Sequence, residues 1–395
     1  MAVGRAVVTE ALLTEIDADA SLRNLTDCFG ESASRAPPRP EAVLRARRRV
    51  GRALNLPAEQ VDAHGPDCKW RYHLVAAIQK MSEDPDEELP TWLRDGAPMG
   101  LRRPLRAGGG IFPPKVSAKT LDPDEVLRRP PMGNHPSFKD RQGCSEPPGH
   151  TVVQTHVDSG FALIFRTRAD AEVYLDSRVV SAPLGTISKI KDGGAMKHRV
   201  IMDLKANGVN DASETPERQV LPTLFQHALD VAALGTLADV TGNLDAGLSF
   251  MILDLKDAFM SIGLDPPERV FNTCCVDRDI VRRRPRGYPD EPDRRRFLVW
   301  TVLGFGGKPN PLVFARAASF ATRSAQAMLR TTPSSAGCRR AGVTLMQCYV
   351  DDPIAATYGT TAERAMAVDL VIAFWLVLGI DLAWKKRGWA HDQHR

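Results

Sequence analysis

The stretch "CYVDDPIAA", residues 348–356, places two adjacent carboxylates, Asp351 and Asp352, directly after an apolar segment that ends in Tyr349 and Val350. Neighbouring negative charges repel each other, and an apolar approach offers them little relief. Asp also favours turns, so the pair alone is compatible with an ordinary hairpin turn between "VTLMQCYV" and "PIAATY". A chemical role for the pair therefore needs a second observation.

A third carboxylate, Asp254, closes the apolar run "LSFMILDL" at 248–255, which is typical of a buried strand. If this strand neighbours the one before Asp351, then Asp254, Asp351 and Asp352 meet at one edge of a sheet. Three carboxylates there repel unless a divalent cation lies among them, and oxygen-only ligands favour Mg²⁺. Two such ions, about 3.5–4 Å apart, stabilise the attacking and leaving oxygens of a phosphoryl transfer. We therefore expect two Mg²⁺ ions here, for which Mn²⁺ can substitute.

The rest of the C-terminal half alternates predicted strands and helices. Two further runs, "VFNTCCV" (270–276) and "RFLVWTVL" (296–303), predict strands joined by a basic loop at 278–296. The order strand, helix, strand, strand, helix, strand favours an α+β fold. We expect an antiparallel sheet with helices on one face, in a split β-α-β arrangement.

Helix-boundary residues mark the two predicted helices of this half. Asn310 and Pro311 open the first as N-cap and first-turn residues. Thr360 and Glu363 form a capping-box pattern at the start of the second, which Gly379 ends.

Residues 1–150 carry less pattern. Segments rich in Pro and Arg, at 34–49 and 128–150, indicate linker or disorder around one predicted helix within 67–81. From about 151 the chain predicts strands around a hairpin that turns at Gly193 and Gly194, followed by helical segments within 215–234.

Composition sets broad limits. The chain has 395 residues, 43% of them apolar and 25% charged, and a net charge of +4, which indicates a globular protein but not by itself a nucleic-acid binder. Basic clusters at 45–52 and 282–296 are compatible with phosphate binding or with solvated surface. Seven cysteines without a C-x-x-C pair favour reduced thiols. The N-terminus lacks the apolar core of a signal peptide and no apolar run is long enough to span a bilayer, so we expect an intracellular protein (cytoplasm or nucleus), not a secreted one.

Five stretches together resemble conserved blocks of the reverse transcriptase family, in the family's order. "KHRVIMDLKANGVN" (197–210) resembles the fingers stretch, and "ILDLKDAFMSI" (252–262) the first catalytic block. "VLGFGGKPNPLVF" (302–314) is similar to the second block, "YVDD" (349–352) matches the third, and "LGIDLAWKK" (378–386) resembles the fourth. The resemblance implies an N-terminal extension, a fingers subdomain and a polymerase palm, with bounds of 1–150, 151–247 and 248–395.

The resemblance also implies an RNA-directed DNA polymerase of a retroelement that uses deoxynucleoside triphosphates and a primed RNA or DNA template. Its metal-ligand set would be Asp254, Leu255, Asp351 and Asp352, with the three aspartates catalytic. Backbone N–H groups at Asp257 and Ala258 would bind the triphosphate.

Further substrate contacts follow from the same resemblance. Phe259 would pack under the sugar and exclude a 2′-hydroxyl, and Phe305 and Gly306 would lie near the nascent base pair. Lys197 and Arg199 would neutralise triphosphate charge, and Lys385 or Lys386 would protonate the pyrophosphate that leaves.

Two alternatives remain at this stage. An RNA-dependent RNA polymerase shares the palm but is expected to carry Gly-Asp-Asp and an Asp in place of Phe259. An inactive or truncated retroelement remnant, at most a nucleic-acid-binding module, is the other, because an aromatic-x-Gly block and a thumb are not found before Arg395. On that basis we expect weak, salt-sensitive nucleic-acid binding and little processive synthesis from residues 1–395 alone.

Overall fold

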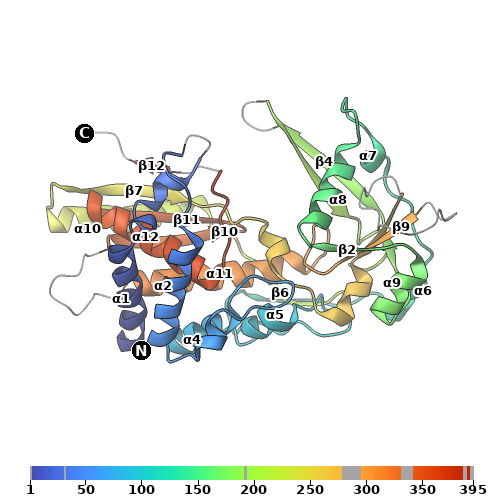
Figure 1. The fold of residues 1–395 in the computed structure, drawn as a ribbon, viewed down its shortest axis with the longest axis horizontal. Helices are drawn as coiled ribbons and strands as arrows, with labels where there is room; N and C mark the ends of the chain where they lie inside the picture. Colours follow the sequence, from blue (N-terminus) through green and yellow to red (C-terminus); the bar gives the residue numbers. More distant parts are fainter. Residues whose placement is uncertain are drawn as a thin grey trace.

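The computed structural model describes residues 2–30, 33–190, 194–277, 295–330, 341–385 and 389–391. Two lobes are visible in Figure 1. The larger lobe, on the left, holds β7, β10 and β11 with several long helices, and the smaller lobe, on the right, holds β2, β4, β9, α8 and α9. The chain has a mixed α+β fold with several small sheets, as the sequence predicts.

The main sheet has four antiparallel strands and carries the three predicted carboxylates at or beside its strand ends. Its order is β10 (Val343–Tyr349), β11 (Asp352–Thr360), β7 (Ala246–Ile252) and β12 (Trp389–His391). Tyr349 pairs with Asp352, so only Val350 and Asp351 form the loop of the β10–β11 hairpin. Strand β7, which Asp254 follows, neighbours the hairpin as expected, but it pairs with β11, the strand after Asp351, and not with β10, the strand before it.

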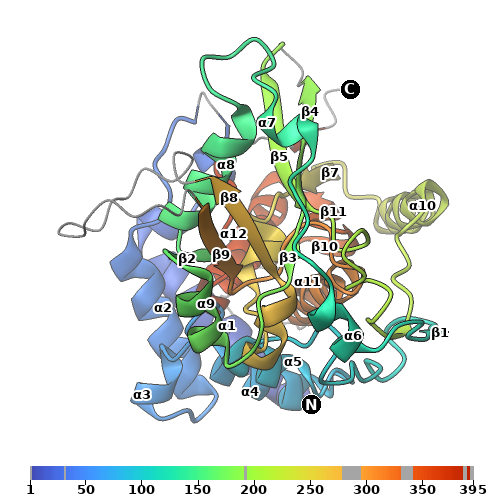
Figure 2. The same ribbon diagram turned by 90° about the vertical axis from the view of Figure 1, so that its right-hand side faces the viewer.

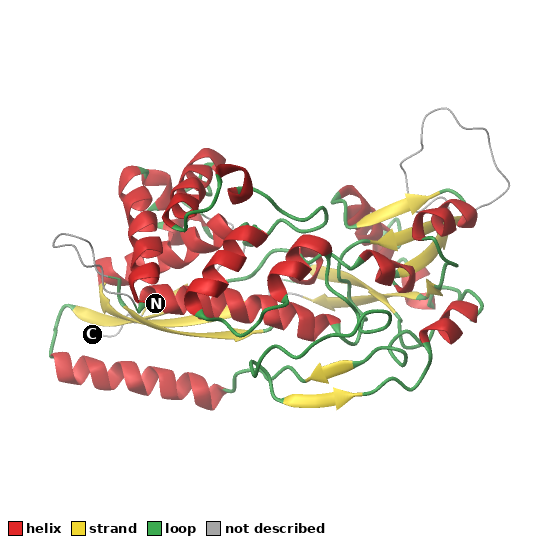
Figure 3. Ribbon diagram, turned by 90° about the horizontal axis from the view of Figure 1, so that it is seen from below, coloured by secondary structure: helices red, strands yellow, loops and turns green. Residues whose placement is uncertain are grey.

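Helices cover both faces of the main sheet (Figure 3). On one face α11 (Asn310–Leu329) and α12 (Thr361–Leu378) pack on residues such as Ala355 and Met251. On the other, Leu234 of α10 (Leu224–Thr241) packs against Ala356 and Tyr358. The expectation of helices on one face was therefore incomplete. Successive residues of β11 point to opposite faces, and both sets are apolar enough to require cover.

Local signals located the boundaries of α11 and α12 well. The helix α11 begins one residue earlier than predicted, because Pro309 is its N-cap and Asn310 lies within the helix, where its side-chain amide donates to the carbonyl of Gly304 at 2.7 Å. The helix α12 has the predicted capping box between Thr360 and Glu363. Gly379 ends α12 in the left-handed conformation, at φ 84°. For α10 the prediction began too early, because the strand β6 (Thr215–Glu217) occupies the first residues of the predicted helical segment.

A second sheet corrects the predicted division between fingers and palm. Strands β8 (Thr273–Asp277) and β9 (Arg295–Trp300) form as predicted, but they do not join the main sheet. They lie in the order β2-β9-β8-β3 with β2 (Ala162–Phe165) and β3 (Ser181–Ala182). Part of the segment assigned to the palm thus belongs to the smaller lobe, and α10, assigned to the fingers, packs on the main sheet. The order of strands along the chain could not predict these pairings, because the paired strands are far apart in sequence.

The remaining described sheets have two strands each. The predicted hairpin is present as β4 (Leu184–Ile190) and β5 (Met196–Met202), which project at the top of Figure 2. Its turn residue Gly193 lies outside the described residues, as do residues 278–294 of the predicted basic loop. Strand β6 pairs with β1 (Pro114–Ser117).

The N-terminal region is helical over most of residues 2–95 and packs into the core, so the expectation of linker or disorder was wrong for 34–49, most of which lies in the helix Pro40–Ala53. Of the other segment, 128–150, most has no regular secondary structure beyond the helix Pro136–Lys139. Buried side chains such as Leu12, Val50, Leu74 and Trp92 belong to the same apolar cluster as the side chains of α11 and α12. The helix predicted within 67–81 is present as α4. The helices up to residue 175 are α1 (Ala2–Ala18), α2 (Pro40–Ala53), α3 (Ala58–Val61), α4 (Tyr72–Ser82), α5 (Leu89–Asp95), α6 (Pro123–Arg128), α7 (Pro136–Lys139), α8 (Pro148–Asp158) and α9 (Arg168–Leu175), with 3₁₀ turns at Ala20–Leu22 and Leu25–Cys28.

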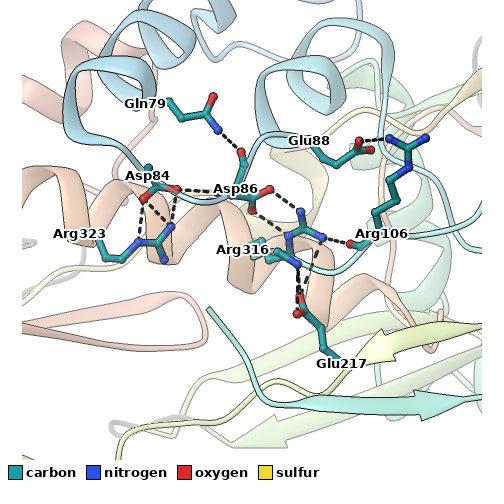
Figure 4. Close-up of polar contacts among 9 residues, drawn as sticks. Gln79, Asp84, Asp86, Glu88, Arg106, Glu217, Arg316 and Arg323 are labelled. Atoms are coloured by element: carbon teal, nitrogen blue, oxygen red, sulfur yellow. Dashed lines mark hydrogen bonds and ion pairs between the residues drawn. The ribbon is translucent and has the colours of Figure 1, made fainter. Parts of the chain in front are cut away.

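A buried ion network fastens this region to α11 (Figure 4). Arg316 of α11 is fully buried, pairs with Asp86 and lies 4.1 Å from the centre of the Trp92 ring. Its guanidinium is also 3.9 Å from Glu217 of β6. Because a buried charge is stable only when it is paired, these partners fix the N-terminal region, β6 and α11 relative to one another.

The basic cluster at 45–52 is mostly neutralised by the protein itself. Arg45 pairs with Asp19, which lies just beyond the end of α1, and Arg49 pairs with Glu15 in the last turn of α1. Arg47 donates to the carbonyls of Leu376 and Val377 at the end of α12. Because these arginines are already paired within the protein, the cluster gives little support for a nucleic-acid-binding surface.

Two general expectations can be compared with the described residues. No disulfide bond joins any of the six cysteines within the described ranges. None of the described helices combines the length and apolar composition needed to cross a lipid bilayer.

Candidate active site

A cavity of about 510 Å³ lies where the two lobes approach each other, and we call it the central cavity. It is lined by β5 and α8 of the smaller lobe, by the segment that follows β7 and includes the start of the 3₁₀ turn Ala258–Ser261, and by the β10–β11 hairpin. Ten of the twelve site residues predicted from the sequence line it: Lys197, Arg199, Asp254, Leu255, Asp257, Ala258, Phe259, Phe305, Asp351 and Asp352. These residues come from four separate stretches of the chain.

Backbone pairing places Asp254 opposite Asp352. The N–H of Leu253 donates to the carbonyl of Pro353 at 3.0 Å, and the N–H of Leu255 donates to the carbonyl of Asp351 at 3.2 Å. Asp254 and Asp352 therefore form a pair without direct backbone hydrogen bonds, a geometry in which Cα atoms lie about 4.5 Å apart. Residues opposite each other in such a pair project from the same side of the sheet.

The hairpin loop itself is conformationally unusual. Val350 has a φ of 58°, a region that β-branched residues rarely adopt. The two-residue loop between Tyr349 and Asp352 requires this backbone shape to reverse the chain tightly. Backbone strain of this kind is concentrated at functional sites, where the surrounding structure maintains it.

The electrostatics of the hairpin are unbalanced. Burial raises the pKa of Asp352, and the neighbouring Asp351 charge raises it further, whereas Lys197 lowers it. Burial also raises the pKa of the Cys348 thiol to about 12, with the same two aspartates contributing. The hairpin thus holds partly buried negative charge, which Lys197 offsets in part.

Aromatic side chains form the wall beside the carboxylates. The Phe259 ring lies 5.4 Å from Phe305, edge-on, and 5.3 Å from Phe314. The Arg199 guanidinium lies over Phe305, 5.5 Å from the ring centre. Such a cation–aromatic contact helps to hold the arginine at the cavity.

Asp257 begins the 3₁₀ turn of Ala258–Ser261. It has left-handed backbone angles, φ 51° and ψ 35°, and its side chain makes no capping hydrogen bond to the turn. The start of the turn faces the cavity through Asp257 and Ala258.

Two predicted site residues lie elsewhere. Gly306 has a φ of 119° and lies against β5, where a Cβ would overlap the carbonyl of Met202. Its close approach is thus to the protein's own backbone rather than to the cavity. Lys385 is exposed and is not among the residues that line the cavity. Lys386 lies outside the described residues.

The donor chemistry of the cavity suits a hard divalent cation. Asp254, Asp351 and Asp352 supply carboxylate oxygens, and backbone pairing brings two of them opposite each other. Within the described ranges, however, no three His, Cys, Asp or Glu side chains are arranged as they stand to hold a metal ion. The backbone therefore brings the donors together, while their side-chain arrangement as a ligand set remains a prediction.

Comparisons with known proteins give a likeness in structure and none in sequence. No family model and no curated protein matches the sequence. Among solved structures, the chain is similar to a foamy viral protease-reverse transcriptase solved in complex with double-stranded DNA, at 15% identity and a TM-score of 0.36. The similarity covers 65% of this chain and 32% of that one, so this chain spans about a third of that protein's length.

Several residues of the cavity were missed by sequence reasoning. Lys256 and Ala383 lie within quoted blocks and could have been found from them, but Val152 and His156 of α8 carry no such signal. Burial lowers the pKa of His156 to about 4, and its ring accepts a hydrogen bond from the Trp300 indole at 3.4 Å. It is therefore a neutral wall residue, which only the packing of the lobes brings to the cavity.

Proposed function

We propose that the chain is the RNA-directed DNA polymerase of a retroelement, which adds deoxynucleotides to a primer 3′ hydroxyl by two-metal nucleotidyl transfer. One observation carries the proposal. Residues from separate blocks of the sequence, to which the resemblance assigns roles in this chemistry, line one cavity around Asp254, Asp351 and Asp352. An ordinary pair of turn aspartates would have no reason to share a cavity with Lys197, Arg199 and Phe259.

Asp254, Asp351 and Asp352 would hold the Mg²⁺ ions, with the carbonyl of Leu255 as a further ligand. When bound, the ions would supply charge stabilisation for the phosphoryl transfer. The protein's own contribution is positioning, because this chemistry needs little else from side chains. The raised pKa of Asp352 supports the assignment, since bound cations would relieve the repulsion between Asp352 and Asp351.

The remaining wall residues would bind the nucleotide. Lys197 and Arg199 project from β5 and would offset triphosphate charge, with Arg199 held over Phe305. Phe259, packed between Phe305 and Phe314, would present its ring to the sugar and exclude a 2′-hydroxyl. Lys385 would act from outside the cavity as the proton donor to pyrophosphate.

Single-nucleotide addition to a primer annealed to an RNA or a DNA template tests the proposal. We expect Mg²⁺-dependent incorporation of the templated deoxynucleotide, and its loss in Asp351→Asn. Asp245→Asn is the matched control, because Asp245 is exposed and does not line the cavity. Incorporation that survives Asp351→Asn would rule out the assigned site.

Measurements on the same protein sample also distinguish the proposed polymerase from a remnant that only binds nucleic acid. A remnant would bind primed template with a strong salt dependence but would incorporate nothing with either Mg²⁺ or Mn²⁺. The absence of a three-ligand cluster among the described residues is the observation that favours this alternative.

A further inference from the structure

The segment 379–385, directly after α12, is hydrogen-bonded to the backbone at Asp254 and at Lys256, on either side of Leu255. The N–H of Ala383 donates to the carbonyl of Asp254 at 2.9 Å. The N–H of Lys256 donates to the carbonyl of Asp381, also at 2.9 Å. Any shift of this segment is therefore transmitted to the backbone that carries Asp254.

The N-terminal region holds the opposite side of the same segment. The N–H of Arg71 donates to the carbonyl of Leu378 at 2.8 Å. Gly379 approaches the carbonyl of Lys69 so closely that a Cβ would overlap it. The Lys69 ammonium pairs with the Asp381 carboxylate at 2.8 Å.

A second set of contacts holds the far end of the segment. The N–H of Gly30 donates to the carbonyl of Trp384 at 2.8 Å. The rings of Phe29 and Trp384 lie 4.6 Å apart, tilted by 33°. Lys385, the proposed proton donor, is the next residue in the chain.

We infer that Phe29, Gly30, Lys69 and Arg71 form a brace that positions the segment 379–385 and, through it, Asp254 and Lys385. The inference rests on the proposed function, and it makes the N-terminal region part of the catalytic apparatus without touching substrate. Lys69 and Phe29 are positioning residues.

The exposure of the Lys69–Asp381 pair allows positioning to be separated from stability. The Lys69 side chain is 72% exposed and that of Asp381 is 46% exposed. Exposed ion pairs contribute about 0–1 kcal/mol to stability, so removing this one should leave the fold intact. The pair Arg102–Asp124 has a similar exposure, 40% and 54%, and a 2.7 Å separation, but it makes no contact with the segment. It provides the matched control.

The kinetic test is single-nucleotide incorporation by the full chain. Because a displacement of about 1 Å can cost ~100-fold in rate, we expect Lys69→Ala and Asp381→Ala to lower kcat about threefold to tenfold with KM for the nucleotide unchanged. The charge reversal Lys69→Asp with Asp381→Lys should restore kcat, and Asp124→Ala should leave it unaltered. A wild-type kcat in Lys69→Ala, or a change confined to KM, would overturn the brace.

Hydrogen exchange gives a readout that needs no catalysis. In Lys69→Ala and Phe29→Ala, amides of residues 254–256 and 379–385 should exchange faster, with other main-sheet amides unchanged and Asp124→Ala as the reference. Unchanged exchange there would refute the brace even in an active enzyme. Faster exchange in a chain that incorporates no nucleotide would instead refute the proposed function and keep the brace.

Discussion

Two regions of the molecule place charge away from solvent in opposite ways. Around Arg316 opposite charges face each other, because one buried guanidinium lies against the carboxylates of Asp86 and Glu217 and the face of Trp92. At the β10–β11 hairpin, Asp351 and Asp352 are adjacent carboxylates, and the Asp351 charge raises the pKa of Asp352 beyond the effect of burial. The hairpin also keeps Val350 at a positive φ.

The comparison shows that the ion pairs of Arg316 help to stabilise the fold, whereas the adjacent aspartates of the hairpin destabilise it. A network of paired opposite charges offsets part of its desolvation cost, and here it fixes three parts of the chain in one arrangement. Like charges and a strained turn cost free energy without any structural return, so they persist where function requires them. Substitutions in the two regions should therefore have opposite consequences for stability.

The largest expected effect is at Arg316. Arg316→Met should lower the free energy of unfolding by about 3–5 kcal/mol, because it leaves the buried Asp86 and Glu217 charges unpaired. Arg323→Met is the control, since Arg323 lies on the same helix, its side chain is partly exposed, and loss of its pair with Asp84 should cost about 1 kcal/mol or less. Denaturant unfolding of both variants measures the difference. Equal losses would show that the network does not join the N-terminal region to α11 in the way described.

Asp369 is an intermediate case, a buried carboxylate of α12 that accepts hydrogen bonds from the backbone N–H groups of Asn24 and Leu25. Burial raises its pKa from 3.8 to about 6. Because the folded state then binds this proton more tightly than the unfolded state, the group destabilises the protein above pH 6. That penalty disappears as pH falls from 6 to 4.

The prediction concerns the difference in unfolding free energy between wild type and Asp369→Asn. Relative to the variant, wild type should gain about 2–3 kcal/mol as pH is lowered from 7 to 4. Taking the difference removes the titration of other groups. A difference that is independent of pH would mean that Asp369 keeps its ordinary pKa.

Elements defined by local sequence patterns were predicted correctly, and the hairpin with its carboxylates is among them. Strands β7, β10 and β11, the cap of α12 and its stop at Gly379 follow from local patterns, and Asp254, Asp351 and Asp352 were selected from them. Local patterns succeed there because each element is apolar, short and bounded by polar or glycine residues.

The N-terminal region was misjudged because its partners are distant in sequence. The arginines of α2 resemble a solvated patch until Glu15, Asp19 and the end of α12 are brought beside them. The pairing of β8 and β9 with β2 and β3, rather than with the main sheet, is likewise a tertiary choice that no local period encodes. The position of His156 at the cavity likewise depends on tertiary packing and not on a local pattern.

A smaller effect is expected on sugar selection. Phe259→Val should raise incorporation of ribonucleotides relative to deoxynucleotides about tenfold, equivalent to about 1.4 kcal/mol, because the smaller side chain leaves room for a 2′-hydroxyl. Incorporation of deoxynucleotides should fall by less than that of ribonucleotides rises. Phe314→Val is the control, since Phe314 is buried against the same ring but does not line the cavity. An unchanged sugar preference in Phe259→Val would reduce Phe259 to a packing residue.

The smallest effect, and the most direct test of strain in the hairpin, is at Val350. Glycine adopts a positive φ without steric cost, whereas valine there stores about 1–3 kcal/mol, and glycine's greater unfolded-state entropy returns about 0.5–1 kcal/mol of that. Val350→Gly should therefore raise the free energy of unfolding by about 0.5–1 kcal/mol. Val343→Gly, in β10 of the same hairpin and half exposed, has no positive φ to relieve and should lower it by about as much. Denaturant unfolding should therefore give changes in the free energy of unfolding of opposite sign for the two Val→Gly substitutions. A loss of stability at both positions would show that the loop beside the carboxylates is not strained.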